Sequence, residues 1–218
     1  MKYDYEGLYD RIVQNVNEYL ASENELLIDN KFEKDVYICC IKIIKLLETL
    51  GETNKISTFY CDQINNELIT LITLLHINNS EIKLLYIRKS AEWFMKWVYE
   101  ITYKKDLNAG FKTLKEHIKQ QEIYIENKYT FDNLMKIFSE SSRYLHTNTN
   151  ETTLEGNLKK VLFSNESIEE WRIIRNNINN ILETTLFFVK FYNDNFEMSQ
   201  TMRFKKFLTK TQIKLVGF

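Results

Sequence analysis

Proline is absent from this chain of 218 residues, and glycine occurs only five times. A β-rich protein of this length would need such residues at many strand ends, so the sequence predicts long helices joined by short polar loops. Apolar runs that could span a bilayer are also lacking, because charged or amide side chains interrupt each run well before about 18 residues. The N-terminus is polar and acidic, unlike a secretory signal, so we expect a cytoplasmic protein that contacts no membrane.

Cysteine and histidine are scarce as well, with three residues of each type. Cys39, Cys40 and Cys61 do not have the spacing of a disulfide framework, so we expect reduced thiols with a structural role. The chain carries no motif with metal-ligand spacing, and we expect neither a metal nor a cofactor. His76 and His117 lie in helical patterns without an acid–base partner nearby in the sequence, and we interpret both as structural.

Acidic residues are missing from the C-terminal end of the chain. After Glu197 there are five basic residues and no acidic one. The remainder holds 24 basic and 30 acidic residues, a net charge of −6, against −1 for the whole protein. Such a basic segment can contact the phosphates of a nucleic acid. The residues we expect to make this contact are Arg203, Lys205, Lys206 and Lys210. A solvated tail, or a segment packed on the body, is the alternative interpretation.

Apolar residues recur at helical spacing along most of the chain. Ser80 can cap one helix, and Ser167 with Glu170 forms a capping-box pattern before another. The predicted helices cover 4–20, 31–50, 55–77, 80–104, 111–126, 131–145, 155–163 and 168–194. The expected fold is therefore all-α, a bundle of about seven to eight helices. We divide it into an N-terminal helical region (1–78), a helical bundle (79–198) and a basic C-terminal tail (199–218).

Arg143 and His146 form the first candidate site, at the end of a predicted helix. The chain has only six arginines and three histidines, and a spacing of i, i+3 puts these two on one helix face. An arginine can bind a phosphate through two parallel hydrogen bonds, and a histidine can transfer a proton near neutral pH. Such a pair suits metal-independent cleavage of RNA by its own 2′-hydroxyl. The alternative is that both residues complement the helix macrodipole.

Arg88 and Glu92 lie on the most apolar predicted helix, at the i, i+4 spacing of an ion pair. They are either a surface ion pair or a supporting pair that steadies the Arg143–His146 site, to which Ser142 would add a hydrogen bond.

The same helix is rich in aromatic residues. We expect these to pack in the core, with a base-stacking platform as the alternative. They are Tyr86, Trp93, Trp97, Tyr99 and Tyr103.

Residues 80–194 resemble a HEPN domain, a helical fold named from higher eukaryotes and prokaryotes nucleotide-binding. The resemblance rests on Ile-Arg-Lys-Ser-Ala-Glu-Trp at 87–93 and on Ser-Arg-Tyr-Leu-His-Thr at 142–147, followed by a polar loop and a long last helix. It implies a homodimer and, in many members, a metal-independent endoribonuclease of toxin–antitoxin, abortive-infection or other anti-phage systems. In the family, the catalytic arginine and histidine lie near a helix end, here Arg143 and His146. Fewer residues separate them in this chain than in the usual family pattern.

Three hypotheses follow from the sequence. The first is a HEPN-like defence protein that binds or cleaves RNA. The second is a non-catalytic helical module, such as an antitoxin, immunity or regulatory partner, that binds another protein through an apolar helix face and the basic tail. The third is a nucleic-acid binder without chemistry, whose binding would weaken with salt and depend on the tail.

Overall fold

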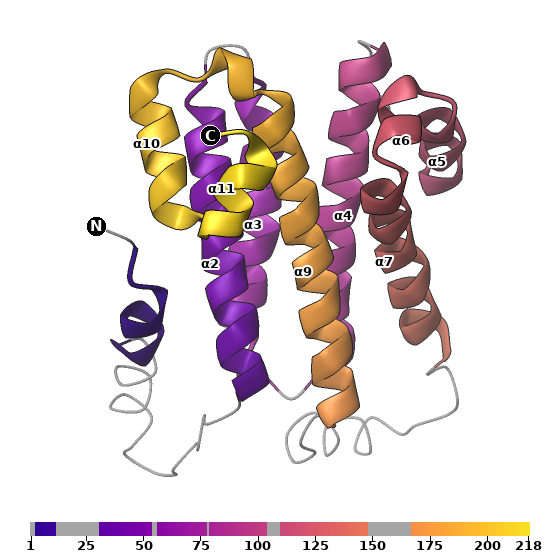
Figure 1. The fold of residues 1–218 in the computed structure, drawn as a ribbon. Coiled ribbons are helices and arrows are strands. Elements are labelled where there is room, and N and C mark those ends of the chain that lie inside the picture. The colour runs from indigo at the N-terminus through magenta and orange to yellow at the C-terminus, as the bar shows by residue number, and fades with distance from the viewer. Residues whose placement is uncertain (1–2, 12–30, 54–55, 78, 104–109, 148–166) are drawn as a thin grey trace.

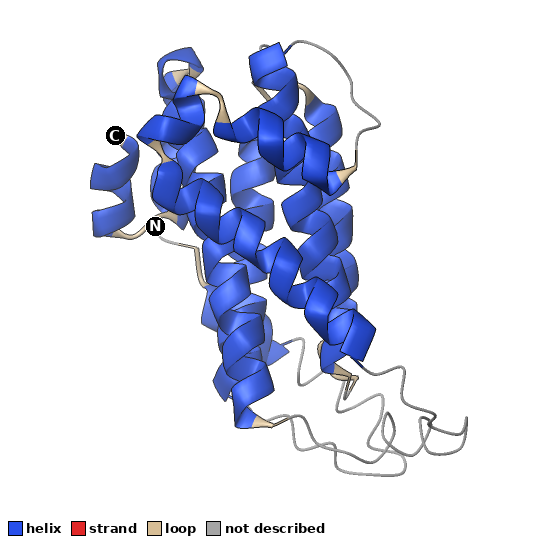
Figure 2. Ribbon diagram, turned by 90° about the vertical axis from the view of Figure 1, so that its right-hand side faces the viewer, coloured by secondary structure: helices blue, strands red, loops and turns tan. Residues whose placement is uncertain are grey.

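The computed structural model describes residues 3–11, 31–53, 56–77, 79–103, 110–147 and 167–218, with the side chains of 142–147 left out. Every regular element in these residues is helical, so the predicted all-α class is confirmed (Figure 2). The elements are α2 (Lys31–Gly51), α3 (Thr58–Thr73), α4 (Ser80–Tyr103), α5 (Phe111–Lys119), α6 (Glu122–Glu126), α7 (Lys128–Thr147), α9 (Ile168–Phe191), a 3₁₀ turn η1 (Asn193–Asn195), α10 (Met198–Phe207) and α11 (Lys210–Val216). Residues 5–11 are also helical.

Four long helices, α2, α3, α4 and α9, form the central bundle (Figure 1). α2 packs on α3 and α9, and α4 packs on α3 and α9, which closes the four into a ring around one core. α7 covers the side of α4 and α9 that faces away from α2, with α5 and α6 beside its first turns. The N-terminal helical region and the bundle defined from the sequence therefore share a single hydrophobic core.

An aromatic cluster fills the upper part of this core. The rings of Trp97 and Phe188 stack with their centroids 4.0 Å apart, and Tyr60 stacks on the same indole at 6.0 Å. Trp97 is 2 % exposed. The expected packing role is confirmed for this tryptophan, whereas Trp93 on the same helix stays half-buried and contacts the exposed ring of Phe59.

Several helix boundaries differ from the predicted ones. The single helix expected over 111–126 is divided at Gln120 and Gln121 into α5 and α6. The helix expected over 131–145 begins earlier and continues to Thr147. The helix expected over 155–163 lies outside the described residues, as does most of the one expected over 4–20.

The C-terminal segment that we described as a tail is folded. α10 packs on α2, and α11 packs on α9. The side chains of Phe204, Leu208 and Val216 are buried, and the ring of Phe204 contacts that of Phe218 at 5.7 Å. The apolar residues between the lysines thus attach this segment to the bundle, while the lysines point outward.

Candidate functional site

Arg143 and His146 lie in the last two turns of α7, which is helical up to Thr147. Their side chains, and that of Ser142, are outside the described part of the structure. The backbone register still assigns Arg143 to a stripe of the helix, because it follows Ser139 by four residues and Lys136 by seven. Ser139 and Lys136 are both exposed. By helix register alone, Arg143 thus shares a stripe of α7 with these two described residues.

The end of α7 lies level with the beginning of α4. The two helices run in opposite directions (Figure 1). The guanidinium of Arg88 on α4 lies 4.1 Å from the ring centroid of Phe138 on α7. Eight residues, or about 12 Å of helix, separate Phe138 from His146 and equally separate Arg88 from Ser80. α9 also begins at this end of the molecule. Hence the last turn of α7 and the first turns of α4 and α9 share one end of the bundle, which we call the α7 end.

Arg88 and Glu92 do not form the expected ion pair in the described structure. The carboxylate of Glu92 instead pairs with Lys96 at 2.9 Å. Arg88 makes a cation–π contact with Phe138, whose ring stacks on Phe111 with a centroid separation of 3.5 Å. Arg88 therefore joins α4 to α7 directly, about a turn and a half before Arg143, and Glu92 takes no part in that contact.

A partly buried polar cluster lies at the α7 end, and sequence reasoning missed most of it. The hydroxyl of Ser80 donates to Glu170 at 2.8 Å, and the backbone N–H and hydroxyl of Ser167 donate to the other carboxylate oxygen of Glu170 at 2.8 Å. Lys83 is fully buried, and its ammonium lies 4.1 Å from the ring centroid of Trp171. The capping-box pattern was the only sequence signal of this cluster, and Lys83 gave none beyond its place in an apolar helix.

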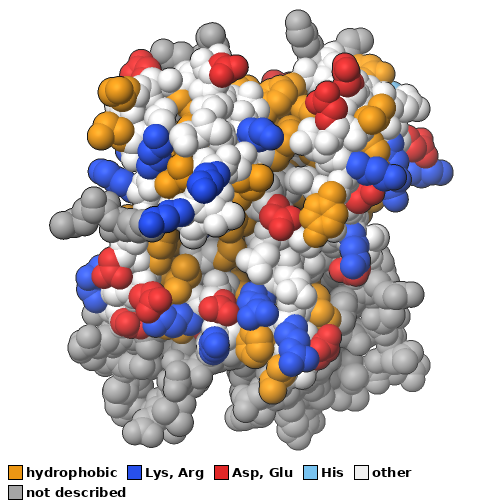
Figure 3. Space-filling model, viewed as in Figure 1, with side chains coloured by type: hydrophobic (Ala, Val, Ile, Leu, Met, Phe, Trp, Pro, Cys, Tyr) orange, Lys and Arg blue, Asp and Glu red, His pale blue; other side chains and the backbone are white. Residues whose placement is uncertain are grey.

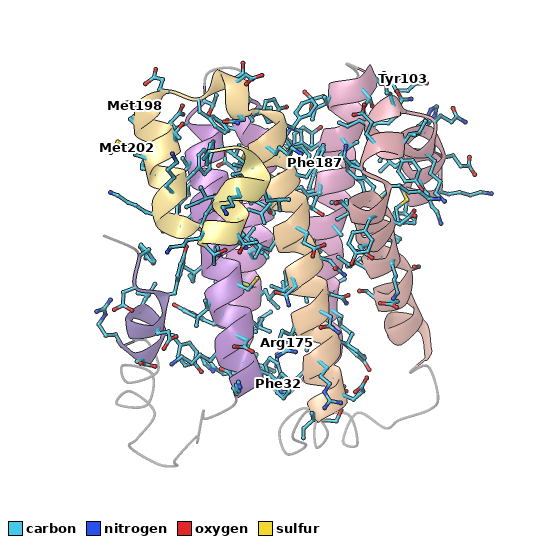
Figure 4. The ribbon with its side chains drawn as sticks, viewed as in Figure 1. Phe32, Tyr103, Arg175, Phe187, Met198 and Met202 are labelled. Carbon is cyan, nitrogen blue, oxygen red and sulfur yellow. The ribbon has the colours of Figure 1, made fainter. Side chains whose placement is uncertain are left out.

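A carboxylate–imidazole pair adds to the polar groups at this end. Nδ1 of His76, just after α3, lies 2.8 Å from Oε1 of Glu33 in the first turn of α2. The Glu33 side chain is only 7 % exposed. Nearby on the surface, the guanidinium of Arg175 pairs with Asp35 at 3.2 Å and faces the ring of Phe32 (Figure 4). His76 thus has an acidic partner that its neighbours in the sequence did not indicate.

Helix starts at this end carry partial positive charge, and acidic side chains of their first turns already lie beside them: Glu81 on α4 and Glu169 and Glu170 on α9. The N-terminus of a helix carries a partial positive charge, and both α4 and α9 begin at the α7 end. A phosphate group near such helix starts is stabilised by the dipoles and by any arginine within reach. Among the described residues, no three histidine, cysteine or acidic side chains gather as a metal site would require.

The four basic residues expected to contact nucleic acid lie far from the α7 end, on α10 and at the start of α11. Arg203 forms a bidentate ion pair with Glu52, the residue that follows α2, and this pair neutralises its charge. Lys205, Lys206 and Lys210 are exposed. The structure therefore places the residues predicted to contact nucleic acid away from the helix end that carries Arg143 and His146.

No protein-family model, curated protein or solved structure matches this chain. None of the helices in the described ranges combines the length and the apolar character that crossing a bilayer would take.

Proposed function

We propose that this protein is a HEPN-like component of a bacterial or phage defence system that cleaves RNA without a metal, with Arg143 and His146 as its reactive pair. The observation that carries the proposal is the helical state of α7 through both residues. At i, i+3 on a continuous helix, two side chains start about 5–6 Å apart, which allows both to reach one phosphate. The resemblance to HEPN domains further implies a homodimer.

The proposed reaction uses the RNA's own 2′-hydroxyl as the nucleophile. His146 removes the 2′-hydroxyl proton as the oxygen attacks phosphorus, and the bond to the 5′-oxygen breaks. The products are a 2′,3′-cyclic phosphate and a 5′-hydroxyl, whose proton comes from water or from a second histidine in a dimer. Arg143 stabilises the negative charge that grows on the phosphorane oxygens. Arg88 supports the pair indirectly by joining α4 to α7 at Phe138.

Cleavage of a labelled RNA by the purified protein in EDTA tests this proposal. We expect His146→Ala and Arg143→Ala each to slow cleavage by about 10²-fold or more, the usual contribution of a proton-transfer or charge-stabilising group. Lys136→Ala is the matched control, because it removes a cation from the same exposed stripe of α7 and should leave the rate unchanged. Cleavage that requires Mg²⁺, or that survives both substitutions, would overturn the assignment.

Growth after induced expression gives a second readout in cells. Toxicity with RNA loss in the wild type, absent in the Arg143→Ala and His146→Ala variants, is the expected result. Harmless expression of all three proteins, together with no cleavage in vitro, would favour the non-catalytic interaction protein. One observation specifically favours that alternative: two methionines on α10, Met198 and Met202, are 81 % and 62 % exposed.

A further inference from the structure

α10 presents an outward face that no described part of the chain covers. Met198 and Met202 are four residues apart, so both project from the same side of this helix, away from the bundle (Figure 4). Lys205 follows Met198 by seven residues and Met202 by three, and Lys206 follows Met202 by four; both lysines are exposed. These four residues form what we call the methionine–lysine face.

The exposed lysines around this face outnumber its acidic neighbours, which are Glu197 before Met198 and Glu52, the partner of Arg203. Basic side chains gather over α10 and α11, with apolar side chains at the outer edge of α10 (Figure 3). Lys210 and Lys214 of α11 are exposed and extend the basic surface. Lys205 and Lys206 form no ion pair within the described residues, and no acidic residue follows Glu197 in the chain. These exposed lysines therefore give this surface a local excess of positive charge, although the rest of the protein has a net charge of −6.

The opposite face of α10 holds the helix firmly in place. Phe204 is fully buried against Phe196, and Gln200 donates a hydrogen bond to Thr53 at 3.1 Å. Arg203 is tied to Glu52. Because the fold uses these residues to attach α10, it does not need the two methionines for its own packing. The methionine–lysine face is thus held in place by the fold, while its two exposed methionines take no part in attaching α10.

We propose that this face binds an acidic amphipathic helix of a partner protein. Methionine side chains are unbranched and polarisable, so they adapt to aliphatic anchors of a partner helix at i, i+4 spacing. Carboxylates flanking those anchors would meet Lys205 and Lys206. α10 is about 15 Å long, which matches two to three turns of a partner helix.

Two other classes of partner fit this face less well. Single-stranded RNA binds through aromatic rings on which its bases stack, and the methionine–lysine face has none. Helices that lie on membranes usually insert Trp, Phe or Leu. Charge complementarity together with adaptable aliphatic contacts therefore favours a protein helix. The proposal does not depend on RNA cleavage by Arg143 and His146.

Fluorescence anisotropy with the full-length protein tests this inference. The probe is a labelled synthetic helix with leucines at i, i+4 and i+7 and flanking glutamates, and the comparison peptide has the same composition in scrambled order. We expect binding in the micromolar range for the amphipathic peptide, at least about tenfold tighter than for the scrambled one. Met198→Ser with Met202→Ser should weaken binding by about tenfold or more.

Reversing the charge of the two lysines on this face provides a second test. Lys205→Glu with Lys206→Glu should abolish binding of the acidic peptide and should create binding of the same peptide with lysines in place of its glutamates. Lys112→Glu with Lys119→Glu, two exposed lysines of α5, is the matched control and should change nothing. The inference is overturned if the acidic peptide fails to bind, if the scrambled peptide binds equally, or if anionic vesicles or an RNA oligomer bind more tightly through the lysines alone. Arg143→Ala and His146→Ala should leave peptide binding intact, so failure of one proposal is distinguishable from failure of the other.

Discussion

Two tryptophans one helical turn apart on α4 show how strongly position decides what a residue contributes. Trp97 is stacked in the core between Tyr60 and Phe188, whereas Trp93 is half-buried beside Phe59. We expect Trp97→Ala to lower the free energy of unfolding by about 3–5 kcal/mol, because it removes a large buried ring and leaves a cavity. Trp93→Ala, the same chemical change, should cost clearly less.

Urea unfolding followed by circular dichroism at 222 nm measures both changes. If Trp93→Ala proves as destabilising as Trp97→Ala, then the half-exposed ring carries as much packing energy as the buried one, and the proposed centre of the core is wrong.

Polar residues at the α7 end show the limit of prediction at this scale. The pattern from Ser167 to Glu170 could be recognised because its two partners are close in sequence. The contacts of Ser80 with Glu170 and of His76 with Glu33 join residues that are far apart in sequence, and no local pattern signals them. Arg88 was expected to pair with Glu92, but in the structure its partner is the ring of Phe138.

At the scale of elements, the start of α9 is a specific test of helix capping. Ser167 accepts a hydrogen bond from the backbone N–H of Glu170, and the Glu170 side chain accepts one from the backbone N–H of Ser167. Ser167→Ala should destabilise the protein by about 1 kcal/mol, since a buried long helix loses its cap. Thr209→Ala removes the equivalent cap of the short helix α11 and should have a smaller effect on global unfolding.

Thermal unfolding of the two variants beside the wild type provides this comparison. A larger loss for Thr209→Ala would mean that the attachment of α11, and not the start of α9, limits the stability of the bundle.

Helix periodicity predicted most of the long helices, but it did not predict that the C-terminal segment packs on the bundle. The lysines there suggested a solvated tail, yet Phe204 and Val216 are fully buried. Apolar residues spaced among the lysines decide the outcome, because each short helix needs only one buried stripe to attach to the bundle. The break between α5 and α6 was missed for a related reason: Gln120 and Gln121 interrupt the helix without a glycine or proline to mark the site.

For the whole molecule, composition was enough to predict an all-α bundle, while the surroundings of the candidate site depend on tertiary contacts. The sequence isolates Arg143 and His146, but only the packing of α7 on α4 brings their helix turn to the end where α4 and α9 begin. That end also holds the buried side chains of Lys83 and Glu33. The fold thus brings together charged residues that are far apart in the sequence, and a local sequence pattern cannot predict such contacts.

The three cysteines give a prediction for the stability of the molecule against pH. Cys39, Cys40 and Cys61 are free and buried in the one core. Burial raises the pKa of Cys39 and of Cys61 to about 12, and it raises the pKa of Cys40 well above the usual range. In the unfolded chain a cysteine has a pKa of about 8.5. The folded protein therefore keeps thiol protons that the unfolded chain releases.

Because the unfolded state binds fewer protons, stability falls as pH rises above about 8.5 and continues to fall towards pH 12. Each buried thiol should lower the free energy of unfolding by about 2 kcal/mol at pH 10 relative to pH 7. Urea unfolding at pH 7, 9 and 10 measures this loss, and Cys61→Ala should reduce the steepness of the decline by about one thiol's share. The matched control is the reaction of native thiols with a disulfide reagent at pH 8, which should be slow until urea unfolds the chain. A free energy of unfolding that stays constant from pH 7 to pH 10 would show that the thiols ionise in the folded state, and so that this core admits water.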